Sequence, residues 1–394
     1  MSFLLQPSFK TIFLGLITIF FVLECGLSTA QANSWRPYKD EDGIFHVLMP
    51  DNYKINKKSF RINDRIVLAS NKVDAIIDER PYKDIIKTFS VKYDQTFASL
   101  IREDDIPDLL TRDINKYIDY YESIGGVIRD KEMGSFNGRP GGEVVFAYKG
   151  EDKKLKSARI RVIYSNTTRV EQVMAVPEDT MFAFRTNDFF KSLNINEGNI
   201  VYDGDPQSSW ENITSPFELA AINVPKKSPP YIPQKMQSTH NNKIEKLSLQ
   251  IYDPVYDNIM FYNVYGYRFN TLMNMHNVQE VLMGSHMGKF TFDTRQLKIS
   301  QGSAGEYPVL SAKVHFSPPD AYPHMNTIKL NAYYYGPFLV VQELLGSNLH
   351  VESLLSRRLM SGLTFTPIQG NKKMQEERSA ANMKALQETS AGEE

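Results

Sequence analysis

The sequence predicts an α+β fold of two tandem domains, each a mainly antiparallel sheet with two helices packed on it. Three observations support this prediction: the length of 394 residues, an internal repeat, and the same order of strand and helix patterns in both copies of the repeat. A chain of this length is too long for one ordinary core, whereas a repeat of about 160 residues is a natural domain size.

The two tryptophans of the chain mark the starts of the two copies. Trp35 stands fifteen residues before Pro50, and Trp210 stands fifteen residues before Pro225. Each proline closes an apolar segment, as expected where a strand ends, because proline cannot donate a ladder hydrogen bond. The spacing therefore predicts the same opening strands in both copies.

A gapless match marks the ends of the copies. Residues 158–195 align with residues 328–365, so that Gln172 corresponds to Gln342 and Leu193 to Leu363. The offset is 175 residues at the tryptophans and 170 at these later positions, which is what a tandem duplication with a small change in length produces. We expect domains over 33–197 and 210–367, a linker over 198–209 and a disordered polar tail over 368–394.

In the first copy we expect strands over 44–49, 66–69, 85–93, 127–136, 143–148, 155–164 and 169–176. A long helix lies between the third and fourth of these, because its apolar residues recur at three- and four-residue spacing. That stripe consists of Ile106, Leu109, Leu110, Ile114, Tyr117, Ile118 and Tyr121. Asp105 is placed to cap the helix and Gly125 to end it. A closing helix carries Phe189 and Phe190.

In the second copy we expect strands over 217–224, 247–251, 259–265, 290–299, 309–316, 327–335 and 338–345. A shorter helix is expected over 272–283, and a closing helix carries Leu354, Leu355 and Leu359. The order of elements matches the first copy.

The first 32 residues have the features of a secretory signal. Lys10 precedes an apolar run over 11–23, and Ala30–Gln31–Ala32 offers a small-x-small cleavage site. The run is shorter than the roughly 20 residues that span a bilayer, which favours a cleaved signal over the alternative, an uncleaved anchor. We expect a periplasmic or secreted chain with no stable transmembrane segment after cleavage. The single cysteine, Cys25, lies in the signal, so disulfides and thiolate chemistry are excluded from the mature chain.

Three local features resemble the PsbP-like superfamily of secreted α/β-sandwich domains. They are the strand "DGIFHVLMP", the segment "NGRPGGEVVFAY" over 137–148, and the ending "VPEDTMFAFRTNDFFKSLNI". The second copy departs from the pattern in its middle. The resemblance implies accessory or binding modules without enzymatic activity, and it carries over no catalytic residue.

Residue motifs assign no catalytic, cofactor or metal site. The seven histidines lack the His-Glu-x-x-His pattern; His315 and His324 flank one loop, but the ligand number of a zinc site is missing. "GSHMGKF" over 284–290 is one residue short of a phosphate loop and is interpreted as a helix end with a glycine cap. We expect no cofactor.

Charged clusters receive structural interpretations. Glu103, Asp104 and Asp105 precede a helix, where negative charge is favourable. A basic run at Lys153, Lys154, Lys156, Arg159 and Arg161 is typical of a solvated strand edge, with an acidic partner or lipid headgroup as the alternative. The net charge of −1 argues against a nucleic-acid partner.

The best recognition candidates are two proline-rich segments, "KKSPPYIPQ" and "SPPDAYPHM". Their exposed residues Tyr231, Tyr322 and His324 are the predicted partner-binding residues, the alternative being rigid connections without a partner. The leading hypothesis is thus a non-enzymatic accessory or binding protein with a protein or envelope partner. A small-ligand or lipid carrier is the alternative, and an envelope hydrolase is third.

Overall fold

The computed structural model describes a chain built mostly of antiparallel sheets with helices packed on them, the α+β class that the sequence predicts. The described residues are 34–51, 53–56, 61–62, 65–67, 70–78, 86–98, 100–181, 184–196, 210–215, 219–225, 234–236, 243–365 and 380. The expected signal, the linker and all of the tail but residue 380 lie outside them. Within these ranges, no helix combines the length and the apolar composition needed to cross a bilayer.

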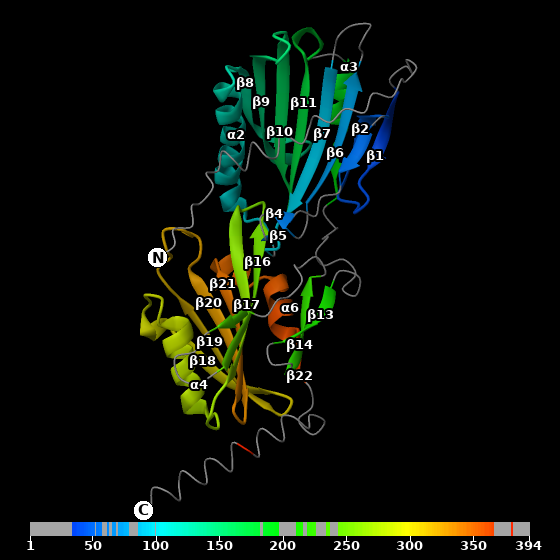
Figure 1. Ribbon diagram of the computed structural model, residues 1–394. Coiled ribbons are helices and arrows are strands. Elements are labelled where there is room, and N and C mark those ends of the chain that lie inside the picture. The colour runs from blue at the N-terminus through cyan, green and yellow to red at the C-terminus, as the bar shows by residue number, and fades with distance from the viewer. Residues whose placement is uncertain are drawn as a thin grey trace, which may run out of the picture.

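The first half of the chain forms a seven-stranded sheet, at the top of Figure 1. Its spatial order is β3 (Tyr53–Asn56), β6 (Ser70–Asp78), β7 (Ile86–Gln95), β11 (Thr168–Pro177), β10 (Leu155–Tyr164), β9 (Arg139–Lys149) and β8 (Val127–Phe136). Helix α2 (Ile106–Ser123) buries Leu109, Leu110, Ile114 and Tyr121 against this sheet, which confirms the predicted stripe.

Two small sheets explain the spacing of tryptophan and proline. Strands β1 (Trp35–Lys39) and β2 (Phe45–Pro50) form a hairpin in which Trp35 faces Pro50. Strands β13 (Trp210–Thr214) and β14 (Ala220–Pro225) form the same hairpin, in which Trp210 faces Pro225. Each hairpin gains a third strand after the closing helix: β12 (Asn194–Ile195) pairs with β2, and β22 (Leu363–Phe365) pairs with β14.

The closing helices are equivalent to the residue. Helix α3 (Phe184–Lys191) and helix α6 (Leu354–Ser361) have bounds that differ by the repeat offset of 170. The amide of Gln172 donates to the carbonyl of Phe189 at 2.8 Å, and the amide of Gln342 donates to the carbonyl of Leu359 at 3.2 Å. Residues that the sequence aligns thus make the same hydrogen bond in both halves.

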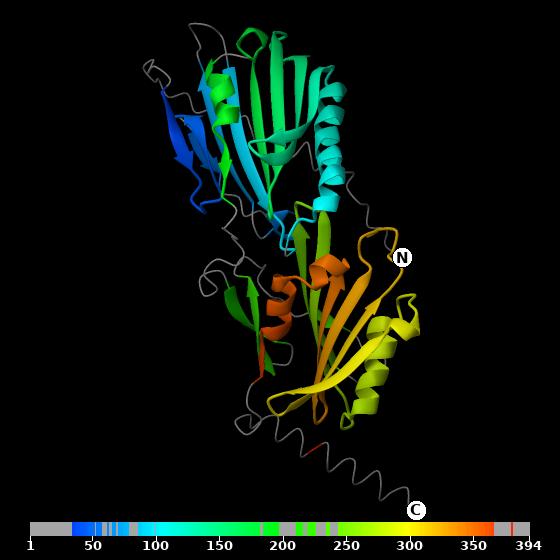
Figure 2. The same cartoon turned by 180° about the vertical axis from the view of Figure 1, so that it is seen from behind.

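The second half forms the larger sheet, at the bottom of Figures 1 and 2. Its order is β18 (Lys298–Ala304), β19 (Tyr307–His315), β20 (Thr327–Tyr335), β21 (Phe338–Gly346), β17 (Asn258–Arg268), β16 (Lys243–Asp253), β5 (Arg65–Val67) and β4 (Arg61–Ile62), with β15 (Gln234–Met236) also on β16. The segment expected as a strand of the first domain near residue 66 therefore pairs, in parallel, with the second half.

Two predicted elements of the second half differ in the structure. The strand expected over 290–299 begins only at Lys298, as β18, because the side chain of Asp293 accepts from the backbone N–H of Arg295 and starts the 3₁₀ turn η6 (Thr294–Gln296) before it. The helix expected over 272–283 begins at α4 (Met275–Val281), where Asn274 forms a capping box with Asn277, and continues as the π-helix η5 (Leu282–Met287). A further short helix, α5 (Asn348–Val351), precedes α6.

At the junction, each half inserts an apolar side chain into the core of the other. Phe97 of the first half lies in the core cluster of the second, whereas Val255, in the turn between β16 and β17, lies in the cluster beneath α2. Both are buried. Arg112 of α2 donates to the carbonyl of Val255 at 2.6 Å. Each half therefore completes part of the core of the other.

Candidate functional site

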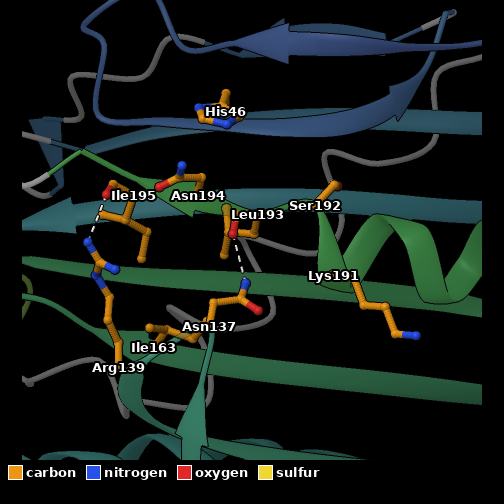
Figure 3. Close-up of a pocket in the computed structure, with 9 residues that line it drawn as sticks. All are labelled: His46, Asn137, Arg139, Ile163, Lys191, Ser192, Leu193, Asn194 and Ile195. Atoms are coloured by element: carbon orange, nitrogen blue, oxygen red, sulfur yellow. Dashed lines mark hydrogen bonds between the residues drawn. The ribbon is translucent and has the colours of Figure 1, made fainter.

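A pocket of about 420 Å³ opens in the first half, where helix α3 ends. Figure 3 shows the lining: His46 on β2, Asn137 and Arg139 at the turn between β8 and β9, and the segment 191–195 between them. Ile163 of β10 completes it. The volume falls in the range of small-molecule sites, roughly 300–1,000 Å³.

Hydrogen bonds fix the walls of this pocket. The side-chain amide of Asn137 donates to the carbonyl of Leu193 at 2.7 Å, and the guanidinium of Arg139 donates to the carbonyl of Ile195 at 2.9 Å (Figure 3). Asn137 takes the left-handed conformation, with φ of 53°, that a tight turn requires and asparagine tolerates. The segment "NGRPGG" thus ties the β8–β9 turn to the end of the closing helix.

The lining is basic. His46, Arg139 and Lys191 contribute to it, and none of the nine lining residues is acidic. His46, Lys191 and Asn194 are exposed at its rim. The lining holds no phenylalanine, tyrosine or tryptophan. The pocket therefore has the volume, but not the aromatic walls, expected of a carrier for apolar ligands.

A second cluster lies at the junction between the halves. The Nδ1 atom of His350 is 2.7 Å from the Oγ atom of Ser347, and its Nε2 atom is 2.9 Å from the Oδ2 atom of Asp253. Asp253 also accepts from the hydroxyl of Thr96 and from the backbone N–H of Val255. His350 and Asp253 are fully buried.

This serine–histidine–aspartate chain also has a structural explanation. Ser347 caps helix α5, and its side chain accepts from the backbone N–H of His350. The ring of His350 packs against Phe97, with ring centres 4.6 Å apart, and against Tyr256 at 5.7 Å. The cluster thus joins the capped helix to the neighbouring half.

A third cluster lies inside the second half, below the π-helix η5. His286 places Nδ1 2.8 Å from the carboxylate of Glu343 and Nε2 2.9 Å from the hydroxyl of Tyr267. Asn263 donates to the same carboxylate at 2.9 Å. Burial acts to raise the pKa of Glu343, but the hydrogen bond and charge of His286, with Lys289 and Asn263, outweigh it and lower the pKa.

The segment "GSHMGKF" ends a helix at a glycine, as the sequence predicts: η5 ends at Met287, and Gly288 is its C-cap residue. The sequence did not reveal that this last part of the helix is a π-helix, in which His286 is buried. A wider turn moves a side chain off the regular helical stripe, and such turns are frequent at functional sites. The histidine–glutamate pairing joins residues 57 positions apart, so that local spacing gave no signal of it.

The charged motifs of the sequence have other roles than expected. Asp105 makes no side-chain cap for α2; it binds the guanidinium of Arg102 and the hydroxyl of Tyr256 in the second half. The basic run is not at a sheet edge, because β10 lies between β9 and β11. Arg159 and Arg161 pair there with Glu143.

The predicted partner-binding residues are only partly placed. Tyr231 lies outside the described residues. Tyr322 is 38% exposed and packs edge-on against Phe261, and His324 is exposed nearby. His315 is hydrogen-bonded to Thr327 rather than to His324. In the part of the chain that the structure describes, no group of three histidine, cysteine or acidic residues is placed to hold a metal ion.

Comparison with known proteins adds remote structural similarities alone. No family model and no curated protein matches the chain. The solved structure of cyanobacterial PsbP (CyanoP) from Synechocystis is similar at 11% identity and a TM-score of 0.29, covering 44% of this chain and 98% of that one. The Ran-binding protein Mog1p of Saccharomyces cerevisiae is similar at 8% identity and a TM-score of 0.28, covering 42% and 96%.

A third solved structure covers more of the chain. The type VI secretion immunity protein TplEi of Pseudomonas aeruginosa is similar at 10% identity and a TM-score of 0.20, covering 84% of this chain and 97% of that one. At these scores the similarities carry no argument about function, which has to come from the residues themselves.

Proposed function

We propose that the chain is a secreted or periplasmic, non-enzymatic binding protein of two PsbP-like domains, and that the pocket at the end of α3 holds its partner. The partner is a protein or another component of the cell envelope. The observation that carries the proposal is the pocket itself: an open, polar cavity whose walls are fixed by Asn137 and Arg139 and whose rim exposes His46, Lys191 and Asn194.

The tandem arrangement has support of its own. The two tryptophan–proline registers, the matching bounds of α3 and α6, and the shared hydrogen bond of Gln172 and Gln342 are what a duplicated domain would retain. These features concern the core and its turns. We place function instead where the two halves differ, and the pocket is such a place.

Affinity capture from envelope extract tests the proposal. Asn194→Trp fills the pocket from an exposed position on β12, and we expect it to lose a partner that the wild-type mature chain retains. Thr364→Trp is the matched control, because Thr364 is exposed at the equivalent position of β22 and faces Ala221 as Asn194 faces His46. Retention of the same proteins by both variants contradicts the proposal.

A second candidate, an ester- or amide-hydrolysing enzyme, is favoured by one observation, the chain Ser347–His350–Asp253. A serine hydroxyl beside a histidine that an aspartate orients is the arrangement of a nucleophile and its base. A fluorophosphonate probe, which labels activated serines, distinguishes the two candidates. If the probe labels the wild type but not Ser347→Ala, Ser347 is an activated nucleophile and the chain is a hydrolase. If the probe does not label the wild type, Ser347 only caps helix α5.

A further inference from the structure

We infer that the pocket at the end of α3 binds a single anionic group, a carboxylate or a phosphate, and that Lys191 and His46 contact it. This inference rests on the proposed function, since it names the chemistry of the same pocket. The three basic side chains come from three separate elements, β2, the β8–β9 turn and the end of α3. With no acidic residue in the lining, an anion there is attracted by Arg139 and Lys191, and the ring of His46 can donate a hydrogen bond to it.

Four backbone carbonyls near the pocket already accept side-chain hydrogen bonds. The carbonyls of Phe189 and Phe190 accept from Gln172 and Arg161, at 2.8 Å and 3.0 Å. The carbonyls of Leu193 and Ile195 accept from Asn137 and Arg139. Carbonyl oxygens at the end of a helix would otherwise repel an anion. Because donors occupy them, the repulsion that an incoming anion meets is reduced.

The second half shows that His46 and Lys191 are not needed for the fold. His46 faces Asn194 across β2 and β12, and the equivalent pair across β14 and β22 is Ala221 and Thr364. Lys191 ends α3, and Ser361 ends α6 at the equivalent position. The same backbone thus forms without a histidine or a lysine at these positions. A structural role that both halves share therefore does not explain His46 and Lys191.

The comparison between the halves also supplies variants that should fold. His46→Ala with Lys191→Ser gives the first half the residues that the second half carries at these positions. Lys149→Ser, at an exposed position of β9 outside the lining, controls for the loss of one positive charge. We expect both proteins to unfold at the temperature of the wild type within about 2 °C, because surface substitutions change stability little.

Calorimetric titration of the full mature chain uses three probes. They are inorganic phosphate, a tripeptide with uncharged side chains and a free terminal carboxylate, and the amidated form of that tripeptide. We expect phosphate or the free tripeptide to bind and the amide not to bind. The double variant should bind at least roughly tenfold more weakly, as the loss of charge-assisted contacts implies, whereas Lys149→Ser should bind as the wild type does.

Each outcome decides the inference. Binding of phosphate alone assigns a phosphate group, and binding of the free tripeptide alone assigns a carboxylate. Absence of binding by both, or equal binding by wild type and double variant, overturns it. If the anions fail to bind while Asn194→Trp still abolishes capture of the partner, the anion chemistry is wrong and the proposed function stands. If capture survives Asn194→Trp, the proposed function itself fails.

Discussion

Glu343 is a fully buried carboxylate, and its charge is stabilised by neighbours that local sequence does not reveal. It accepts from Asn263 and lies against the ring of His286, which in turn contacts Tyr267. A buried charge is tolerated only when it is paired and hydrogen-bonded, so this cluster holds the π-helix η5 to the sheet at β17 and β21.

The pKa of Glu343 makes the stability of this cluster depend on pH. The pKa is lowered in the folded chain, so its contribution is present above the unfolded value of about 4.3 and is lost as pH falls through the folded value. We expect Glu343→Gln to cost about 2 kcal/mol of unfolding free energy at pH 7. The difference from the wild type should shrink below about pH 4 in chemical denaturation measured across pH.

Glu352→Gln is the control for this prediction. Its carboxylate pairs with Lys313 at 2.6 Å but is partly exposed, so we expect a loss of less than about 1 kcal/mol. Equal losses for the two variants at pH 7 would show that burial of the His286–Glu343 pair has no special effect.

The turn between β8 and β9 is the element that shapes the pocket, and Gly141, just after the turn in β9, is packed too closely to carry a side chain. A Cβ atom on Gly141 would lie 2.7 Å from the carbonyl oxygen of Val162 and 2.9 Å from the ring of Phe136. A Cβ atom on Gly134, in the partner strand, would meet nothing within 4 Å. The two glycines sit opposite each other in the ladder.

We predict that Gly141→Ala destabilises the chain by about 2 kcal/mol, since overpacking against backbone forces the strands apart. Gly134→Ala should change stability by less than about 0.5 kcal/mol. Thermal or denaturant unfolding measures both. A neutral Gly141→Ala would mean that β9 can shift freely, in which case the turn does not fix the pocket walls.

Among the elements, the hairpins and the long helix could be predicted from the sequence, whereas the pocket could not. The tryptophan–proline spacing corresponds to hairpin register, and the helical stripe of α2 is buried as expected, because both patterns are local. The pocket was not predicted. His46, Arg139 and Lys191 each lie in one of the three segments that resemble PsbP-like domains, but those segments were interpreted as core and turn features, and they are far apart in the chain. The π-helix was missed because its buried histidine follows no periodic pattern.

At the scale of the whole molecule, the exchange of Phe97 and Val255 makes each half part of the core of the other. We expect this packing to couple the stability of the second half to that of the first. Phe97→Ala removes a buried ring, and we expect it to lower the free energy of unfolding by about 4 kcal/mol. Backbone amides of β17 and β21 in the second half should then exchange hydrogen faster. Phe190→Ala, within the core of the first half, should speed exchange chiefly there.

If Phe97→Ala accelerates exchange only in the first half, the packing at the junction does not couple the halves. The linker would then join two independent domains.

An anionic group bound in the pocket at the end of α3 would contact the first half alone. The most direct measurement is a backbone NMR titration of the isotope-labelled chain from residue 33 onward, with inorganic phosphate and with the free tripeptide. We expect chemical-shift changes confined to residues around 46, 137–139 and 191–195, with none at the equivalent positions around 221 and 361–364. Absence of shifts with both probes, or equal shifts in the two halves, would contradict it.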